Sequence, residues 1–207
     1  MPEPTNLTDL PEDIAPATFF QLVAAELAAQ PVPPGAPEDE AVVTLTGGGG
    51  GSWTIAVQGG EVTVREGAAQ APLLHATMTV DDWRSFVAGR VRDIVRDAAG
   101  RLVFDPAELA KLQERAGAVK ALRDLPGTLV VRLDDAEAGA THTLGLTTGG
   151  APVAVDAPTA TITIKVEDMA GLIAGHEDPM AAFFSGKIAL DGDMNHVMGL
   201  FGALNAS

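Results

Sequence analysis

The chain of 207 residues contains no cysteine, no tyrosine and only two tryptophans. Without cysteine, neither disulfide bonds nor thiolate metal sites can form, and the sequence gives no information about its redox compartment. Because aromatic residues are so few, the core must be built mainly from aliphatic side chains and methionine, which adapt to irregular shapes.

Basic residues are also scarce: 13 Lys and Arg stand against 28 Asp and Glu, for a formal net charge of -15. This balance argues against nucleic-acid binding, which needs clustered cations, and against permanent attachment to an anionic membrane. At most, transient membrane contact is compatible with it. No apolar run approaches 18 residues and no basic-then-apolar leader opens the sequence, so we expect no membrane-spanning helix, no signal peptide and a cytoplasmic location.

What the sequence does contain is most distinctive in residues 159–204. Ile162 and Ile164 alternate with polar residues, a pattern typical of a half-buried strand. The apolar period then changes to three and four, which predicts a helix directly after the strand and two more that begin at Asp178 and Asp193. This segment therefore predicts a strand covered by several apolar helices.

The amino-acid sequence of this segment resembles that of a known family. The phrases ATITIKVEDM, LIAGHEDP and AAFFSGKIALDGDM, followed by an apolar final helix, are similar to the sterol carrier protein 2 (SCP2-like) family. The resemblance extends over Gly127 to Leu204 in the order of elements. It implies an α+β fold in which a five-stranded sheet and its helices enclose an apolar tunnel for sterols, fatty acids or acyl-CoA.

The same resemblance implies that apolar side chains of the three helices line this tunnel and that the last helix forms its lid. The candidate ligand-binding residues are Met169, Leu172, Ile173, Met180, Phe183, Phe184, Met194, Val197, Met198 and Phe201. The competing interpretation is ordinary core packing, because apolar residues at helical spacing are more often core than ligand contacts.

The first half of the chain can be aligned with the second at an offset of 86 residues. Trp83 to Gly89 then lies over Met169 to Gly175, and Gly100 to Asp105 lies over Gly186 to Asp191. Two copies of one αβ pattern at a fixed offset predict an internal duplication, with the two sheets side by side as a pseudo-dimer within one chain.

This hypothesis divides the chain into two SCP2-like pseudo-repeats that share a helix. Residues 1–17 are expected to be a disordered lead-in, residues 18–125 a degenerate repeat, and residues 106–207 the repeat with the better-matched motifs; the shared helix covers 106–125. Because the first copy replaces an apolar helix with a charged one, the ligand pocket is expected in the second copy.

Catalytic and metal-binding patterns are weak. The four histidines are scattered without paired ligand spacing, and no nucleophile-elbow motif is present. The run Asp191 to Asn195 begins like a calcium loop, but His196 and Gly202 stand where that loop needs a glycine and a bidentate carboxylate. We therefore predict no catalytic residue, no metal and no cofactor.

The leading hypothesis is a soluble, non-catalytic protein that binds or transports a hydrophobic small molecule. Two alternatives stay open: a structural or accessory interaction module whose core is closed by its own side chains, and an enzyme acting on a hydrophobic substrate. The sequence does not identify the ligand or the oligomeric state.

Overall fold

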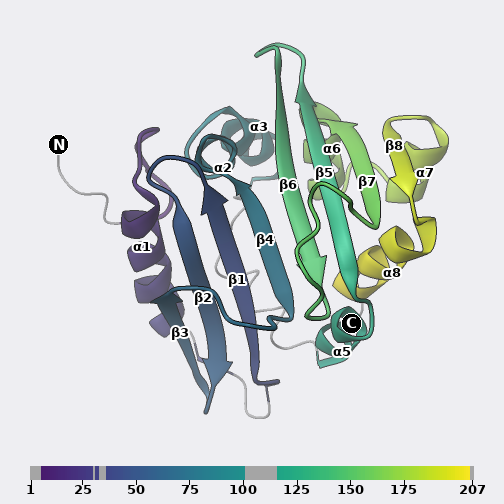
Figure 1. The fold of residues 1–207 in the computed structure, drawn as a ribbon. Coiled ribbons are helices and arrows are strands. Elements are labelled where there is room, and N and C mark those ends of the chain that lie inside the picture. Colours follow the sequence, from purple (N-terminus) through teal and green to yellow (C-terminus); the bar gives the residue numbers. More distant parts are fainter. Residues whose placement is uncertain (1–5, 30, 33–35, 101–115, 206–207) are drawn as a thin grey trace.

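The structure is a computed structural model, and it describes residues 6–29, 31–32, 36–100 and 116–205 (Figure 1). It is a mixed α+β fold, as predicted, with helices packed on a large sheet. In chain order the elements are α1 (Pro16–Ala28), β1 (Asp39–Thr46), β2 (Gly51–Gln58), β3 (Glu61–Glu66), β4 (Leu74–Thr79), α2 (Val80–Val87), α3 (Arg90–Ala99), α5 (Ala116–Arg123), β5 (Gly127–Asp135), β6 (Ala140–Thr148), β7 (Ala160–Lys165), α6 (Val166–Ile173), α7 (Pro179–Phe184), β8 (Ile188–Gly192) and α8 (Met194–Asn205).

All eight strands belong to one sheet, in the order β3-β2-β1-β4-β6-β5-β7-β8. Two pairs are parallel, β1 with β4 and β5 with β7; the other neighbours are antiparallel. Strands β4 and β6 join the two halves of the chain, with Leu74 opposite Thr148. The two halves thus lie side by side, but in one continuous sheet rather than in the separate five-stranded sheets that the family resemblance implied.

The two halves repeat one order of elements. In each, a hairpin (β1-β2 or β5-β6) is followed by a strand parallel to the hairpin's first strand and then by a helix. The bounds of β4 and α2, 74–79 and 80–87, fall at those of β7 and α6 when 86 is added. The half from 116 onward has no counterpart of β3, and a counterpart of β8 would fall near 102–106, outside the described residues.

Local sequence accounts for several boundaries. Gly59 and Gly60 have φ values of 61° and 81°, which glycine adopts without strain, and they close the tight turn between β2 and β3. Asp178 caps α7 as predicted, because its Oδ1 accepts a hydrogen bond of 2.9 Å from the amide of Ala181. Thr79 caps α2 in the same way, with a 3.0 Å bond from the amide of Asp82.

The N-terminal segment differs from the expected lead-in. The placement of residues 1–5 is not described, but Leu7, Leu10 and Ile14 are buried in the core. Helix α1 begins at Pro16, within the expected lead-in, because proline is favoured at the first helical position. Phe20 of this helix stacks on Trp53 of β2 with ring centroids 4.4 Å apart.

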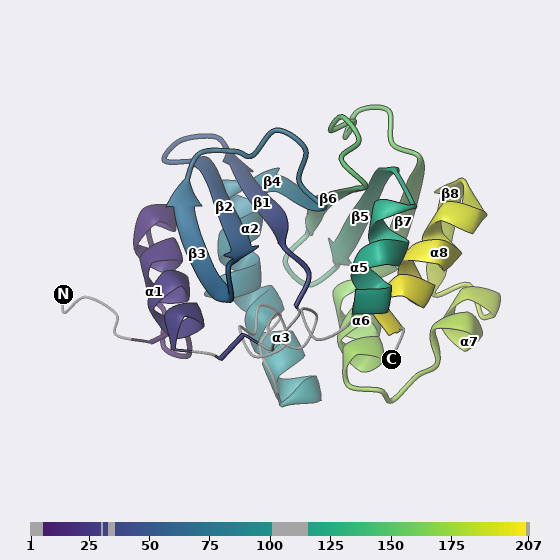
Figure 2. The same cartoon turned by 90° about the horizontal axis from the view of Figure 1, so that it is seen from below.

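The helices gather on one side of the sheet (Figure 2). Loops cover part of the other side: the amide of Ala69 donates to Thr54, and the amide of Ala154 donates to Thr128.

In the described ranges, no helix is long and apolar enough to cross a membrane. The predicted shared helix is described only as α5, from Ala116, because 106–115 lie outside the described residues.

Candidate functional site: an apolar cavity between sheet and helices

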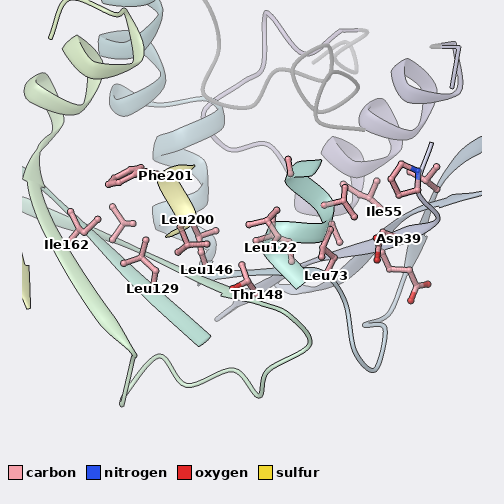
Figure 3. A pocket seen from close by; sticks show the side chains of 18 of the residues that line it. Asp39, Ile55, Leu73, Leu122, Leu129, Leu146, Thr148, Ile162, Leu200 and Phe201 are labelled. Carbon is pink, nitrogen blue, oxygen red and sulfur yellow. The ribbon is translucent and has the colours of Figure 1, made fainter. Parts of the chain in front are cut away.

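A cavity of about 350 Å³ lies between the sheet and the helices that cover it (Figure 3). Its volume is at the lower end of the range typical of small-molecule sites. The lining is almost entirely aliphatic and comes from both halves of the chain: Leu27, Pro37, Asp39, Glu40, Ala41, Ile55, Val57, Leu73, Leu74, Ala118, Val119, Leu122, Leu129, Val131, Leu146, Thr148, Ile162, Ile164, Met169, Leu172, Ile188, Leu200 and Phe201.

The strands supply this lining because alternate residues of a strand share one face. Leu129 and Val131 of β5 face the cavity, as do Ile162 and Ile164 of β7. Ile55 and Val57 of β2 extend the same apolar surface into the first half. The sheet therefore forms one continuous apolar wall across the junction of the halves.

The helices form the opposite wall. Met169 and Leu172 of α6, three residues apart, lie on the same side of that helix, and Leu122 of α5 and Leu200 of α8 complete the cover. In Figure 3 the labelled side chains form an extended row, with Asp39 and Ile55 toward one end and Ile162 and Phe201 toward the other. Such a shape accommodates an elongated apolar molecule.

Polar groups of the lining come from three residues: Asp39, Glu40 and Thr148. Arg123 Nη2 donates to both carboxylate oxygens of Asp39, at 2.6 and 2.7 Å. Arg65 Nη2 donates to Glu40 Oε1 at 2.8 Å, and the hydroxyl of Thr148 donates to the carbonyl of Leu125 at 2.5 Å. Each of these polar groups already has a protein partner.

The predicted site residues divide into three groups. Three line this cavity: Met169, Leu172 and Phe201. Six, including Phe201 again, line a second cavity of about 40 Å³ between α7, β8 and α8: Met180, Phe183, Met194, Val197, Met198 and Phe201. Ile173 and Phe184 line neither cavity; Ile173 is half-buried, and the side chain of Phe184 is 79% exposed.

The larger cavity is therefore not confined to the second half, where the sequence placed it. The contributions of Ala41, Ile55 and Leu73 were missed. Strand alternation does mark Ile55 as facing a core, but a buried face gives no sign of whether the space against it is filled. That depends on how far the helices stand from the sheet.

The structure also brings together a serine, a histidine and an aspartate that the sequence did not single out. Ser85 Oγ lies 3.3 Å from His142 Nε2, and His142 Nδ1 lies 3.1 Å from Asp82 Oδ1. Hydrolase triads use this order of groups. However, Ser85 lies inside helix α2, where its amide is part of the helix, and none of the three lines either cavity. We interpret the cluster as a polar contact between α2 and β6.

Another histidine, on α8, is buried. His196 of α8 is 4% exposed, and its Nε2 has no hydrogen-bond partner. Burial lowers the pKa of His196, and the nearby Asp193 carboxylate only partly opposes this. In the part of the chain that the structure describes, no group of His, Asp and Glu is arranged to hold a metal ion.

The second half of the chain is similar to a known protein family. Residues 107–205 match the model of the SCP-2 sterol transfer family. The resemblance predicted from Gly127 to Leu204 is thereby confirmed, and it extends upstream to the segment that contains α5. None of the curated proteins matches the chain.

Several solved structures are similar in part. Sterol carrier protein 2 from Yarrowia lipolytica, in its apo form, is 16% identical, covers 59% of this chain and 92% of its own, and superposes with a TM-score of 0.36. The sterol carrier protein domain 2 of Helicoverpa armigera is 25% identical over 47% of this chain and 85% of its own, with a TM-score of 0.33. Palmitated SCP2L2 from Aedes aegypti is 21% identical over 47% and 91%, with a TM-score of 0.37.

Proposed function

We propose that this protein binds and carries a hydrophobic small molecule, of the sterol, fatty-acyl or fatty-alcohol kind, in the cavity between the sheet and the helices. The observation that carries the proposal is the cavity itself: about 350 Å³ of space lined almost entirely by aliphatic side chains. The match of residues 107–205 to a sterol transfer family supports the same class of ligand.

The energetics favour such a ligand without special polar contacts. Each buried methylene contributes roughly 0.8 kcal/mol, so a chain of about ten methylenes gains on the order of 8 kcal/mol before the cost of association. Among the described lining residues there is no activated nucleophile, and the Ser85 cluster lies elsewhere. Binding without a change of bonds is therefore the activity that the cavity supports best.

We further propose that the chain consists of two fused SCP2-like units. The repeated order of β1, β2, β4 and α2 in β5, β6, β7 and α6, together with the constant offset of 86 residues, supports this division. On this proposal the two units contribute to one shared binding site rather than each enclosing its own.

The binding proposal is tested by native mass spectrometry of the purified protein, before and after incubation with dodecan-1-ol, dodecanoate and cholesterol. A discrete mass above that of the chain supports the carrier function. A chain mass that stays unchanged after all three incubations contradicts it and favours an interaction module with a closed core.

A matched pair of variants connects any uptake to the cavity. Leu172→Trp introduces a larger side chain at a half-buried lining position, so we expect it to reduce uptake at least tenfold. Phe184→Trp changes an exposed residue that lines neither cavity and is expected to leave uptake unchanged. Circular dichroism of both variants checks that they are folded.

A further inference from the structure

The ionisable residues that border the cavity lie side by side on β1. Among the described lining residues, the ionisable side chains are Asp39 and Glu40, both acidic, and no Lys, Arg or His contributes to the lining. A carboxylate can only accept hydrogen bonds. The hydroxyl of Thr148 uses its proton on the carbonyl of Leu125, so it too is left as an acceptor.

The nearest cations are already neutralised. Arg123 forms a two-pronged ion pair with Asp39, and Arg65 pairs with Glu40. The side chain of Asp39 is only 18% exposed, so this charge is screened less than a fully exposed one. Glu40 follows Asp39 on β1, so its side chain and Arg65 lie on the face of the sheet opposite to Asp39 and the helices. An anionic headgroup entering here would have to displace Asp39 from Arg123 and would face the Asp39 carboxylate.

From this arrangement we infer that the cavity selects neutral lipids that carry a hydroxyl group, such as a fatty alcohol or a sterol, over fatty-acid anions. The hydroxyl proton is donated to the Asp39 carboxylate, which has lone pairs left beside its bonds to Arg123, while the apolar body extends along the row of aliphatic side chains toward Ile162 (Figure 3). A fatty-acid anion has no proton to donate and is repelled at the same place. This inference rests on the proposed function and names its ligand class.

The direct test compares two probes that differ only in the headgroup, dodecan-1-ol and dodecanoate, at pH 8. Dissociation constants are measured by displacement of an environment-sensitive fluorescent probe. We expect the alcohol to bind at least tenfold more tightly than the acid anion. Equal affinity, or tighter binding of dodecanoate, would overturn the inference while leaving the carrier function intact; failure of both probes and of cholesterol to bind would overturn the carrier function as well.

Two charge-neutralising variants locate the selectivity. Asp39→Asn removes the repulsion and releases Arg123, so the preference for the alcohol should fall at least threefold. Asp191→Asn removes the same charge from an exposed position on β8 that lines neither cavity, and it should leave the preference unchanged. Glu40→Gln removes a charge from the opposite face of β1 and keeps the Asp39–Arg123 pair, so it should also leave the preference unchanged. If Asp39→Asn, shown to be folded by circular dichroism, retains the full preference, this carboxylate does not determine it.

Discussion

One buried histidine, His196, and one half-buried histidine, His75, make stability sensitive to mild acid. Burial lowers the pKa of both His75 and His196, although Nε2 of His75 has a partner in Thr44 Oγ1 at 2.8 Å while Nε2 of His196 has none. A lowered pKa means that the native state keeps the neutral form while the unfolded state binds a proton. The contribution of these histidines to the free energy of unfolding is therefore fully present above the unfolded pKa of about 6.5. It is lost as the pH falls below that value.

We accordingly predict that the free energy of unfolding, measured with urea, decreases between pH 7.5 and pH 5.5. In His196→Leu the decrease should be smaller, because His75 alone then contributes. An undiminished decrease in His196→Leu would show that His196 titrates normally in the folded state.

At the level of single residues, helix caps could be predicted from the sequence, but the exposure of individual apolar side chains could not. The helix start at Asp178 was predicted correctly because the chemistry of a cap is local. Phe184 carries the same apolar signal as Phe183, yet it is 79% exposed while Phe183 lines the small cavity. Which side of a six-residue helix meets a neighbour depends on tertiary packing that one sequence does not record.

At the level of elements, Arg90 forms one of the polar connections between the two halves. Arg90, the first residue of α3, donates to Asp135 Oδ2 at the end of β5, at 2.7 Å, and to Glu137 in the following turn, at 2.5 Å. The side chain of Asp135 is fully buried. Burial tends to raise the pKa of Asp135, but the amide of Ala138 and the charge of Arg90 outweigh it, so the pKa lies below its usual range.

Asp135→Asn should lower the free energy of unfolding at pH 7 by about 1–3 kcal/mol, because a buried, charge-assisted hydrogen bond is weakened. A carboxylate with a lowered pKa stabilises the fold above its unfolded pKa of about 3.9 and loses that contribution as the pH falls through its folded pKa. The difference between parent and variant should therefore shrink below about pH 4. Urea unfolding at pH 7 and pH 3.5 measures both effects.

Asp134→Asn, at the neighbouring residue, is the control for the Arg90–Asp135 ion pair. Asp134 accepts from Thr141 in an exposed position, so its replacement should change the free energy of unfolding by less than about 0.5 kcal/mol. Equal losses in the two variants would mean that Arg90 does not distinguish the buried carboxylate from an exposed one.

Periodicity predicted most of the elements because each signal lies within a few residues. Ile162 and Ile164 alternate in β7, and the helix expected after them is α6. Where the prediction differed, a partner distant in sequence decided the outcome. Leu7, Leu10 and Ile14 were assigned to a disordered lead-in, but they are buried because the first half offers them an apolar surface.

Across the whole molecule, the pairing of β4 with β6 determines the shape of the site. This pairing makes one sheet of two similar halves, and the cavity then extends from Ala41 and Ile55 in the first half to Ile162 in the second. The sequence indicated the two halves through their offset of 86 residues but not the edge by which they join. Strand edges expose the same backbone groups whatever their side chains, so pairing between distant strands leaves little trace in composition.

The measurement that tests this account most directly is the affinity of Ala41→Phe for dodecan-1-ol, compared with that of Ala189→Phe. Ala41 lies on β1 and lines the cavity from the first half, whereas Ala189 is exposed on β8 in the second half and lines neither cavity. A shared cavity predicts that Ala41→Phe weakens binding at least tenfold while Ala189→Phe binds as the parent does. Unchanged affinity in a folded Ala41→Phe protein would contradict the account and return the binding site to the second half alone.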